Sequence, residues 1–289
     1  MSDYKQLRAK ILKKYDKNKN GFVEIDEYLA SEMSKGPNES KGNIKYHFQK
    51  YENVYNFFTI LTLKNIDAFK ILCIPQFEVF IENLYPIRTN AAIDIYSNKY
   101  YFPSSMPDAI NKCIDSGARI VYFNLQIKWT NEWFTHSNFV LIDTKKKTIE
   151  RFEPHGCTSI NKNIDQFMKE IAINDIGLSG KGYKYLSPEV ISPEIGIQKI
   201  ADAYTGLCIP IGMMYFFMRI MNVDTKQKVI VEYFTKMGEK KLKRVLLKFT
   251  KYIENTLKEH ADIVNKLNNE LDNFLGGLKE LHNKIIIDF

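Results

Sequence analysis

Three β-rich runs follow one another in the middle of the chain, and they limit the folds that it can adopt. They are ARIVYFNLQI (118–127), SNFVLIDT (137–144) and TIERFEP (148–154). β-Branched and aromatic residues dominate all three, which is typical of strands that pack into a core. Only a short lysine-rich segment separates the second run from the third, so these two predict a β-hairpin. A further short strand is expected at 182–188.

Helical patterns flank these strands on both sides. In 105–116, Pro107 falls in the first turn and Gly117 follows the end, which is the usual asymmetry of helix termini. Other helices are expected at 4–33 (two helices around a polar loop), 54–72, 160–176, about 210–221 and 240–287, the last as one or two long helices with a heptad-like seam. Helices before and after a set of strands indicate an α+β fold.

Changes in composition divide the chain into four regions. Residues 1–35 form a helix–loop–helix unit, and the linker-like SKGPNESKG (34–42) follows it. Residues 43–117 are mixed and carry no motif. Residues 118–224 contain the β-rich runs, and 225–289 form a helical tail. We therefore expect four structural regions along the chain.

Composition and charge indicate a globular protein with a core. Hydrophobic residues make up 45% of the chain, which does not fit a disordered protein, and a net charge of +7 permits an anionic partner without demanding one. The four cysteines (Cys73, Cys113, Cys157 and Cys208) are widely separated, so neither a zinc site nor a disulfide is expected. That spacing and a charged N-terminus predict an intracellular protein rather than a secreted one. The longest apolar run, 206–221, is too short to span a bilayer, so no membrane association is expected.

The most specific motif is DKNKNGFVEIDE (16–27), which matches the calcium-loop pattern D-x-[DN]-x-[DN]-G-x5-E. Calcium prefers hard oxygen ligands arranged around a sharp turn. The expected ligands are the side chains of Asp16, Asn18 and Asn20, the backbone carbonyl of Phe22 and the bidentate carboxylate of Glu27, with Gly21 at the turn and Glu24 acting through water. The loop resembles an EF-hand and predicts bound Ca²⁺, although no second hand is evident to pair with Val23. A solvated polar turn between two helices is the alternative.

The predicted hairpin has a histidine at the start of its first strand and a glutamate at the end of its second. These residues are His136 and Glu153. A short turn brings these two ends side by side, so the pair forms by local geometry alone. A carboxylate beside an imidazole can fix its tautomer, as in the base and orienting group of a nucleophilic enzyme. Asn138 is the alternative orienting group if Glu153 points away.

Cys208 is the candidate nucleophile. In YTGLCIPIGMMYFF (204–217) it lies just before Pro210, which is expected to be the first residue of a buried helix. The N-terminus of a helix lowers the pKa of a cysteine through its dipole and its N–H groups. Upstream, Gln198 offers a neutral amide donor for an oxyanion. A lone cysteine among apolar residues is otherwise most often part of a core.

Together, HSN…ERFEPHG…GIQ…DAYTGLC resembles the thiol proteases of giant DNA viruses, which are similar to the adenovirus maturation protease and the SUMO-type ubiquitin-like-protein proteases. The resemblance covers about 118–224. It implies that the base is His136, the orienting group Glu153, the oxyanion donor Gln198 and the nucleophile Cys208, with no cofactor for catalysis. It also implies a central mixed β-sheet flanked by helices, with the cysteine opening a buried helix. The implied substrates are viral precursor proteins or ubiquitin-like conjugates cleaved after small Gly-containing motifs, in the host cytoplasm or the virion.

Two positions depart from that family. Ser137 replaces a frequent Trp, and Ile209 replaces a frequent Gly beside the nucleophile. Because Ile209 would crowd the cysteine, the alternative is a catalytically inactive virion or scaffold protein that acts through its helical tail, under calcium control. His155 and Cys157 are also near the motif, but we expect them to be loop residues outside the site.

The helical tail suggests two further partners. Its heptad-like seam would allow self-association through helices. KMGEKKLKRVLLKFTK (236–251) combines basic residues with an apolar stripe, which would allow nucleic-acid binding. A solvated helix face is the more common role of such a pattern.

Overall fold

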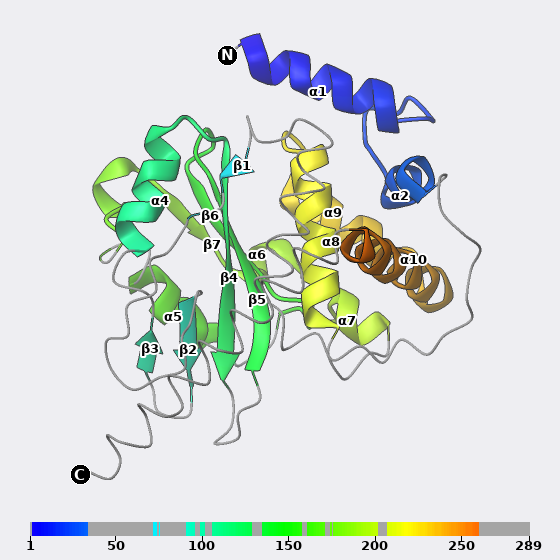
Figure 1. Ribbon diagram of the computed structural model, residues 1–289. Helices are drawn as coiled ribbons and strands as arrows, with labels where there is room; N and C mark the ends of the chain where they lie inside the picture. The colour runs from blue at the N-terminus through cyan, green and yellow to red at the C-terminus, as the bar shows by residue number, and fades with distance from the viewer. Residues whose placement is uncertain are drawn as a thin grey trace.

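The protein is described here from a computed structural model, shown in Figure 1. It has an α+β fold in which helices flank a central mixed β-sheet. The structure describes residues 2–33, 72–73, 75, 91–95, 99–101, 106–128, 135–157, 161–170, 174, 176–201 and 207–259. The predicted linker at 34–42 and the tail after residue 259 lie outside these residues. So does the predicted helix at 54–72, except that Leu72 belongs to a strand.

The sheet is built on the three predicted β-rich runs. Its described strands are β1 (Leu72–Cys73), β2 (Ala91–Asp94), β3 (Lys99–Tyr101), β4 (Ile120–Lys128), β5 (Thr135–Asp143), β6 (Thr148–Phe152) and β7 (Lys184–Leu186). They lie in the order β3-β2-β4-β5-β6-β7, and β1 also pairs with β4. The pairs β4–β5, β5–β6 and β2–β3 are antiparallel, whereas β1–β4, β2–β4 and β6–β7 are parallel. The sheet is therefore mixed, and the predicted hairpin is β5–β6.

The described α-helices are α1 (Ser2–Tyr15), α2 (Ile25–Met33), α4 (Met106–Asp115), α5 (Asn161–Glu170), α6 (Pro188–Ile191), α7 (Ile197–Ile200), α8 (Cys208–Met221), α9 (Gln227–Thr235) and α10 (Glu239–Lys258). Six of them, α1, α2, α4, α5, α8 and α10, lie where the sequence predicted helices. The sequence did not predict α6, α7 or α9. Among the described residues, no helix combines the length and the apolar character needed to cross a membrane.

Two hydrophobic cores lie on opposite faces of the sheet. Along β4, alternate residues point to opposite sides: Tyr122 joins the core with α8, whereas Val121 and Phe123 join the core with α4 and α5. Figure 1 shows α4 and α5 on one side of the sheet and α8, α9 and α10 on the other. The arrangement has three layers, and the larger of the two cores is on the α8 side.

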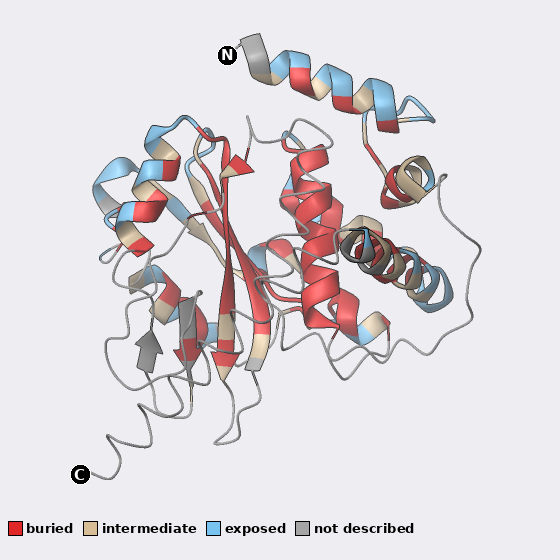
Figure 2. Ribbon diagram, viewed as in Figure 1, coloured by how far each residue is buried: buried red, intermediate tan, exposed pale blue. Residues whose placement is uncertain are grey.

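Helix α8 is the centre of the larger core. Every residue from Cys208 to Met221 is buried, as Figure 2 shows. A helix that is apolar on all sides can be stable only when neighbours surround it. Gly212 lets β5 approach closely, since a Cβ atom there would lie 1.8 Å from the Phe139 ring. Contact between the helix backbone and this ring sets the distance between α8 and the predicted hairpin.

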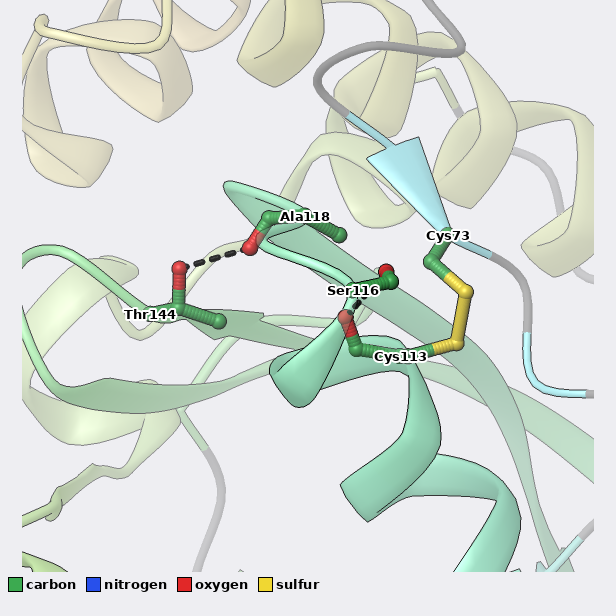
Figure 3. Close-up of a disulfide and its surroundings, with 5 residues drawn as sticks. All are labelled: Cys73, Cys113, Ser116, Ala118 and Thr144. Atoms are coloured by element: carbon green, nitrogen blue, oxygen red, sulfur yellow. Dashed lines mark hydrogen bonds between the residues drawn. A yellow bond between two sulfur atoms is a disulfide. The ribbon is translucent and has the colours of Figure 1, made fainter. Parts of the chain in front are cut away.

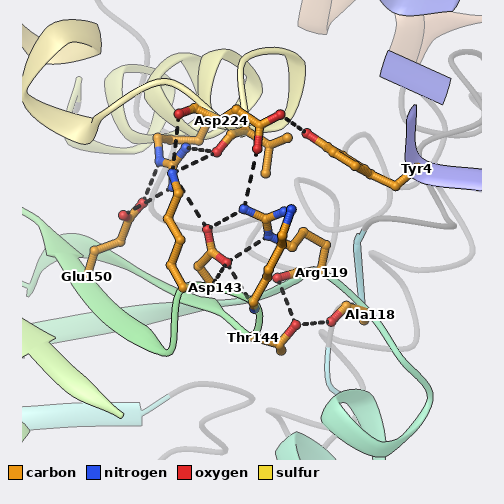
Figure 4. Close-up of polar contacts among 11 residues, drawn as sticks. Tyr4, Ala118, Arg119, Asp143, Thr144, Glu150 and Asp224 are labelled. Atoms are coloured by element: carbon orange, nitrogen blue, oxygen red, sulfur yellow. Dashed lines mark hydrogen bonds and ion pairs between the residues drawn. The ribbon is translucent and has the colours of Figure 1, made fainter. Parts of the chain in front are cut away.

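Buried ion pairs fix the far end of α8. Arg219 donates to both oxygens of Glu150 on β6, at 2.8 and 3.3 Å. Nearby, Arg119 donates to both oxygens of Asp143 at 2.7 and 3.1 Å. Figure 4 shows this cluster, which Tyr4 joins by donating a 2.9 Å hydrogen bond to Asp224. All four charged groups of the two ion pairs are buried, so removing one partner would leave a costly unpaired charge.

The N-terminal helix–loop–helix unit packs on this layer. Leu7, Ile11, Tyr28 and Leu29 all belong to the core that contains α8 and α10. The backbone N–H of Val23 donates to the Asn222 side chain at 2.8 Å, and the Asn222 amide donates back to the Val23 carbonyl at 2.9 Å. The side chain of Asn222, just after α8, therefore satisfies the two backbone groups that were expected to need a second hand.

Helix α10 places its apolar seam inside the molecule. Leu242, Leu246, Phe249 and Ile253 are all buried in the same core. This part of the seam is therefore occupied by contacts within the chain. On the opposite face, Lys240, Arg244 and Lys248 are exposed, as both the predicted nucleic-acid binding and its alternative, a solvated helix face, require.

A disulfide corrects the expectation that no cysteines pair. Cys73 and Cys113 are bonded, with their Cα atoms 5.5 Å apart, and Figure 3 shows the bridge between β1 and α4. The bond forms because β1 runs parallel to β4 with Cys73 opposite Val121, while α4 immediately precedes β4 in the chain. Sequence spacing does not reveal this, because the two cysteines are 40 residues apart.

Candidate active site

The register of the β5–β6 hairpin determines how its end residues meet. Phe139 pairs with Phe152, so continuing the same antiparallel register places Asn138 opposite Glu153 and His136 opposite His155. Glu153 reaches His136 across the diagonal, and its Oε1 lies 2.5 Å from Nε2 of the imidazole. The predicted contact between His136 and Glu153 is therefore present, and two other side chains face them.

Cys208 reaches this pair from the first position of α8. Its thiol is hydrogen-bonded to the His136 side chain, and the backbone N–H of Ser137 also donates to the sulfur. The helix begins two residues earlier than predicted, at Cys208 rather than Pro210. Pro210 is tolerated there because the first turn of a helix requires no N–H from it. This early start puts the sulfur at the N-terminal end of the helix dipole.

Each member of the group shifts the ionisation of the others. Burial alone would lower the pKa of His136, but the Glu153 carboxylate and the hydrogen bond that the imidazolium donates to the Cys208 sulfur raise it to about 10. Burial alone would raise the pKa of Glu153, but the charge of His136 lowers it to about 2. Burial also opposes ionisation of Cys208, and the contact with His136 and the Ser137 N–H overcome this, so that the pKa of the thiol is lowered. The environment therefore favours a thiolate beside an imidazolium.

A buried polar network holds the Glu153 carboxylate, which is 1% exposed. Its Oε2 accepts a 2.8 Å hydrogen bond from the Asn138 amide. The oxygen of that amide in turn accepts from Arg151 at 2.5 Å. Arg151 is anchored by Asp165 of α5 at 2.8 Å, and Tyr185 donates to the same carboxylate at 2.6 Å. Asn138 therefore supports Glu153 rather than replacing it, and Arg151 extends the support to Asp165 of α5.

Gln198 lies at the start of α7, next to the end of the hairpin. Its backbone N–H donates to the Pro154 carbonyl at 2.9 Å, and the residue is 2% exposed. The neighbouring Gly196 N–H donates to the His155 carbonyl at 3.0 Å. Gly156 makes this approach possible, since a Cβ atom on it would lie 2.5 Å from the backbone nitrogen of Gly196. These contacts tie α7 to the residue that follows Glu153.

Three ligand-type side chains of the site lie close together. Atoms of His136, Glu153 and His155 are all within 4.8 Å of one another. The two imidazole rings are stacked, with centroids 4.4 Å apart and planes 6° from parallel. Lone pairs in the planes of parallel rings do not converge on one point, whereas a metal ion needs converging ligands. This arrangement therefore fits an organised imidazole better than a metal site.

The calcium-type loop between α1 and α2 turns its oxygens inward. Asp16 accepts from the backbone N–H groups of Asn20 and Gly21 at 3.1 and 2.9 Å. Glu27 accepts from the N–H groups of Lys17 and Asn18, both at 2.9 Å. Gly21 has a φ of 79°, as expected for the sharp turn. Asn18 and Asn20 also accept backbone N–H groups, at 3.0 and 2.8 Å, and Phe22 supplies one of those N–H groups.

No protein-family model matches the chain, and a search of curated proteins found no similar sequence. A function for the chain therefore has to be inferred from the site itself.

Sequence reasoning missed two contributors to the site. His155 was expected to be a loop residue, yet its ring stacks on His136. Arg151 was not considered, yet it supports Asn138. Both could have been found from the alternation of the hairpin, because residues two apart on a strand share a face. By that rule Arg151 and His155, each two residues from Glu153, share its face.

Proposed function

We propose that this protein is a cysteine endopeptidase. The observation that supports it most directly is the connected series of hydrogen bonds from the Cys208 thiol to His136 and on to Glu153. A thiolate is the reactive form of cysteine, and it gains most from a neighbouring imidazolium at a helix N-terminus. A structural cysteine in a core requires none of these partners.

The proposed reaction uses each residue of the site in turn. The Cys208 thiolate attacks a substrate carbonyl carbon, and His136 donates its proton to the departing amine as the peptide bond breaks. Water then attacks the resulting thioester while His136 takes up a proton, and the thiolate leaves as the carboxylic acid product forms. Glu153 keeps the imidazole oriented and stabilises its charge throughout.

The oxyanion of each tetrahedral intermediate needs donors close to the nucleophile. The backbone N–H of Cys208 is suited to this role, because the first N–H groups of a helix have no intrahelical acceptor. The side-chain amide of Gln198 is proposed as the second donor, in line with the family resemblance of its position. The contact between Gln198 and Pro154 supports this assignment, because it ties the amide-bearing helix to the hairpin end.

The resemblance of the His136, Glu153, Gln198 and Cys208 order to viral maturation and SUMO-type proteases supports protein substrates. We infer viral precursors or ubiquitin-like conjugates cleaved after small Gly-containing motifs, in the host cytoplasm or the virion. Disulfides are uncommon in reducing compartments such as the cytoplasm. The Cys73–Cys113 disulfide would therefore have to form and persist in the host cytoplasm or the virion.

Alkylation of the thiols by iodoacetamide at pH 6 tests the proposal without a known substrate. Mass spectrometry would compare Cys208 with Cys157, the other free cysteine, in the wild type and in His136→Ala. Cys157 is a suitable control because burial and nearby carboxylates raise the pKa of its thiol, whereas that of Cys208 is lowered. We expect Cys208 to react faster in the wild type and to lose that advantage in the variant.

Equal, slow alkylation of both thiols in both proteins would contradict the protease proposal. It would favour the alternative, a catalytically inactive virion or scaffold protein acting through its helical tail. Because the seam from Leu242 to Ile253 is already buried, self-association would then have to use other residues of the tail.

We also propose that the loop at 16–27 binds Ca²⁺ and stabilises the α1–α2 unit. The inward-facing oxygens of Asp16, Asn18, Asn20 and Glu27 and the full motif support this. Titration of the protein with CaCl₂ in a calorimeter, with MgCl₂ as the comparison ion, tests it. Binding of Ca²⁺ that disappears in Glu27→Gln is expected, whereas equal heats in the two proteins would reject the site.

A further inference from the structure

His155 contacts the site in two ways that the proposed reaction does not use. Its ring stacks face to face on His136, with centroids 4.4 Å apart and planes within 6° of parallel. Its backbone N–H donates to Glu153 Oε1 at 2.9 Å. That oxygen is the one that lies 2.5 Å from the His136 imidazole. One residue therefore limits both the plane of the imidazole ring and the position of the oxygen that orients it.

The turn that carries His155 is itself fixed. Its carbonyl accepts from the Gly196 N–H at 3.0 Å, and the Cys157 N–H donates to Pro193 at 2.9 Å. Gly156 has a φ of 93°, and a Cβ atom there would lie 2.6 Å from the Pro193 carbonyl oxygen. The backbone on both sides of His155 is thus held against the segment before α7. Because its backbone is fixed, the His155 ring can restrict the movement of the His136 ring.

The charge state of His155 allows its ring to stack on a protonated His136. Burial and the charge of His136 lower the pKa of His155 to about 4, the Glu153 carboxylate opposes this, and Lys199 adds to it. These are the charged groups that act on the ring from β5, the hairpin end and α7. At neutral pH the ring is uncharged, and the face of an uncharged aromatic ring attracts a cation. A protonated ring in the same place would instead repel the imidazolium.

We propose that His155 is a positioning residue of the active site, which holds the His136 ring between Glu153 and Cys208 and supports its positive charge through face-to-face stacking. This inference builds on the proposed protease chemistry. It gives a role to the second histidine, which lies opposite the first when the register of β5 and β6 is continued beyond Phe152. It also predicts that a flat uncharged ring is what the position needs, and that the ring nitrogens of His155 are dispensable.

The test compares His155→Phe, which keeps a flat uncharged ring, with His155→Ala, which removes it. In both variants the backbone N–H to Glu153 is retained, so only the stacking differs. The first readout is the rate of Cys208 alkylation by iodoacetamide between pH 5 and 9. We expect His155→Ala to shift the midpoint of that profile upward by about one pH unit, the order of a desolvated cation–ring contact. His155→Phe should restore the wild-type profile.

A second readout separates this inference from the protease proposal. In Cys208→Ser protein, which lacks the ionisable thiol, ¹H–¹⁵N NMR titration of His136 reports its pKa directly. His155→Ala should lower that pKa and His155→Phe should not, whether or not the chain is a protease. If both variants leave the pKa of His136 unchanged, the positioning role is wrong. If His155→Phe lowers it as much as His155→Ala does, the imidazole itself rather than stacking is required, and the inference also fails.

Discussion

At the residue scale, the main feature is a group of three ionisable side chains that are hydrogen-bonded to one another and buried. His136, Glu153 and Cys208 each favour the charged form of another, although burial opposes the charge of all three. Such a group is stable only when every lone pair and proton has a partner. Asn138 and the backbone N–H of His155 supply the partners of Glu153. The cost of keeping these charges in the core is therefore offset by neighbours on the same hairpin.

This pairing predicts a pH-dependent contribution to stability. The folded pKa of Glu153 is about 2, below its ordinary 4.5, so its contribution is present above that ordinary value and is lost as pH falls toward 2. The folded pKa of His136 is about 10, above its ordinary 6.5, so its contribution is complete below 6.5 and is lost as pH rises through 10. The difference in unfolding free energy between wild type and His136→Ala should therefore be largest from about pH 4.5 to 6.5. Urea unfolding across pH 3 to 9 measures it, and a difference that is flat with pH would contradict the pairing.

The sequence predicted much of this site because its key pair is local. His136 and Glu153 lie at the two ends of one hairpin, so a β-pattern and a short turn are enough to bring them together. The exact partners were harder to predict, because they depend on register. A shift of one residue would exchange which side chains face each other. That is why Asn138 was considered a substitute for Glu153. His155 was placed outside the site because it was considered only together with Cys157, two positions away on the same loop.

At the scale of elements, the distance between α8 and β5 controls the site. Gly212 on α8 lies against the Phe139 ring on β5, and Cys208 and His136 lie on the same two elements. Since a core is packed too tightly to absorb an added carbon freely, a change at this contact is transmitted to the spacing of the two elements. The contact therefore couples core packing to the geometry of the thiol and imidazole.

Gly212→Ala tests this coupling. In a helix, alanine is ordinarily more favourable than glycine, but here its Cβ atom would overlap Phe139. We expect a loss of about 1–3 kcal/mol in unfolding free energy and slower alkylation of Cys208. Gly180→Ala is the matched control, because a Cβ atom there meets nothing within 4 Å. Chemical denaturation of both variants gives the comparison, and a stabilised Gly212→Ala would show that the contact is not limiting.

The elements that the sequence did not predict are short or depend on distant partners. Strands β1 to β3 have two, four and three residues, too few for a periodic pattern. Helices α6 and α7 have four residues each. The start of α8 was placed at Pro210 because proline favours the first helical position, whereas here it occupies the third. Long periodic elements such as α10 were predicted correctly over the described part of the tail.

At the scale of the whole molecule, contacts distant in sequence join its regions. The Val23 backbone and the Asn222 side chain connect the calcium-type loop to the end of α8. The Cys73–Cys113 bond connects the segment before the sheet to α4. Neither contact could be predicted from the sequence, because each depends on the relative placement of elements and not on any local pattern.

Removal of the disulfide should destabilise the folded protein. A cross-link across a separation of 40 residues restricts the unfolded chain, and the loop-entropy relation gives a contribution of about 4 kcal/mol for a loop of this length. Thermal unfolding of the wild type with and without reductant, and of the double variant Cys73→Ser/Cys113→Ser, measures this. The reduced wild type and the double variant should unfold at similar, lower temperatures. No change in either would mean that the two cysteines are not joined in the isolated protein.

The complete burial of α8 has a consequence for the hydrogen exchange of its backbone amides. Backbone amides exchange with solvent hydrogen only when their helix opens, and a helix enclosed on every side opens only with the rest of the core. The amides of α8 should therefore be among the slowest to exchange in the molecule. Cys208, which we propose as the nucleophile, is the first residue of this helix, so its position should be kept until the core itself opens. Under the proposed endopeptidase function, the same burial would keep the α8 backbone out of reach of a second copy of the protein.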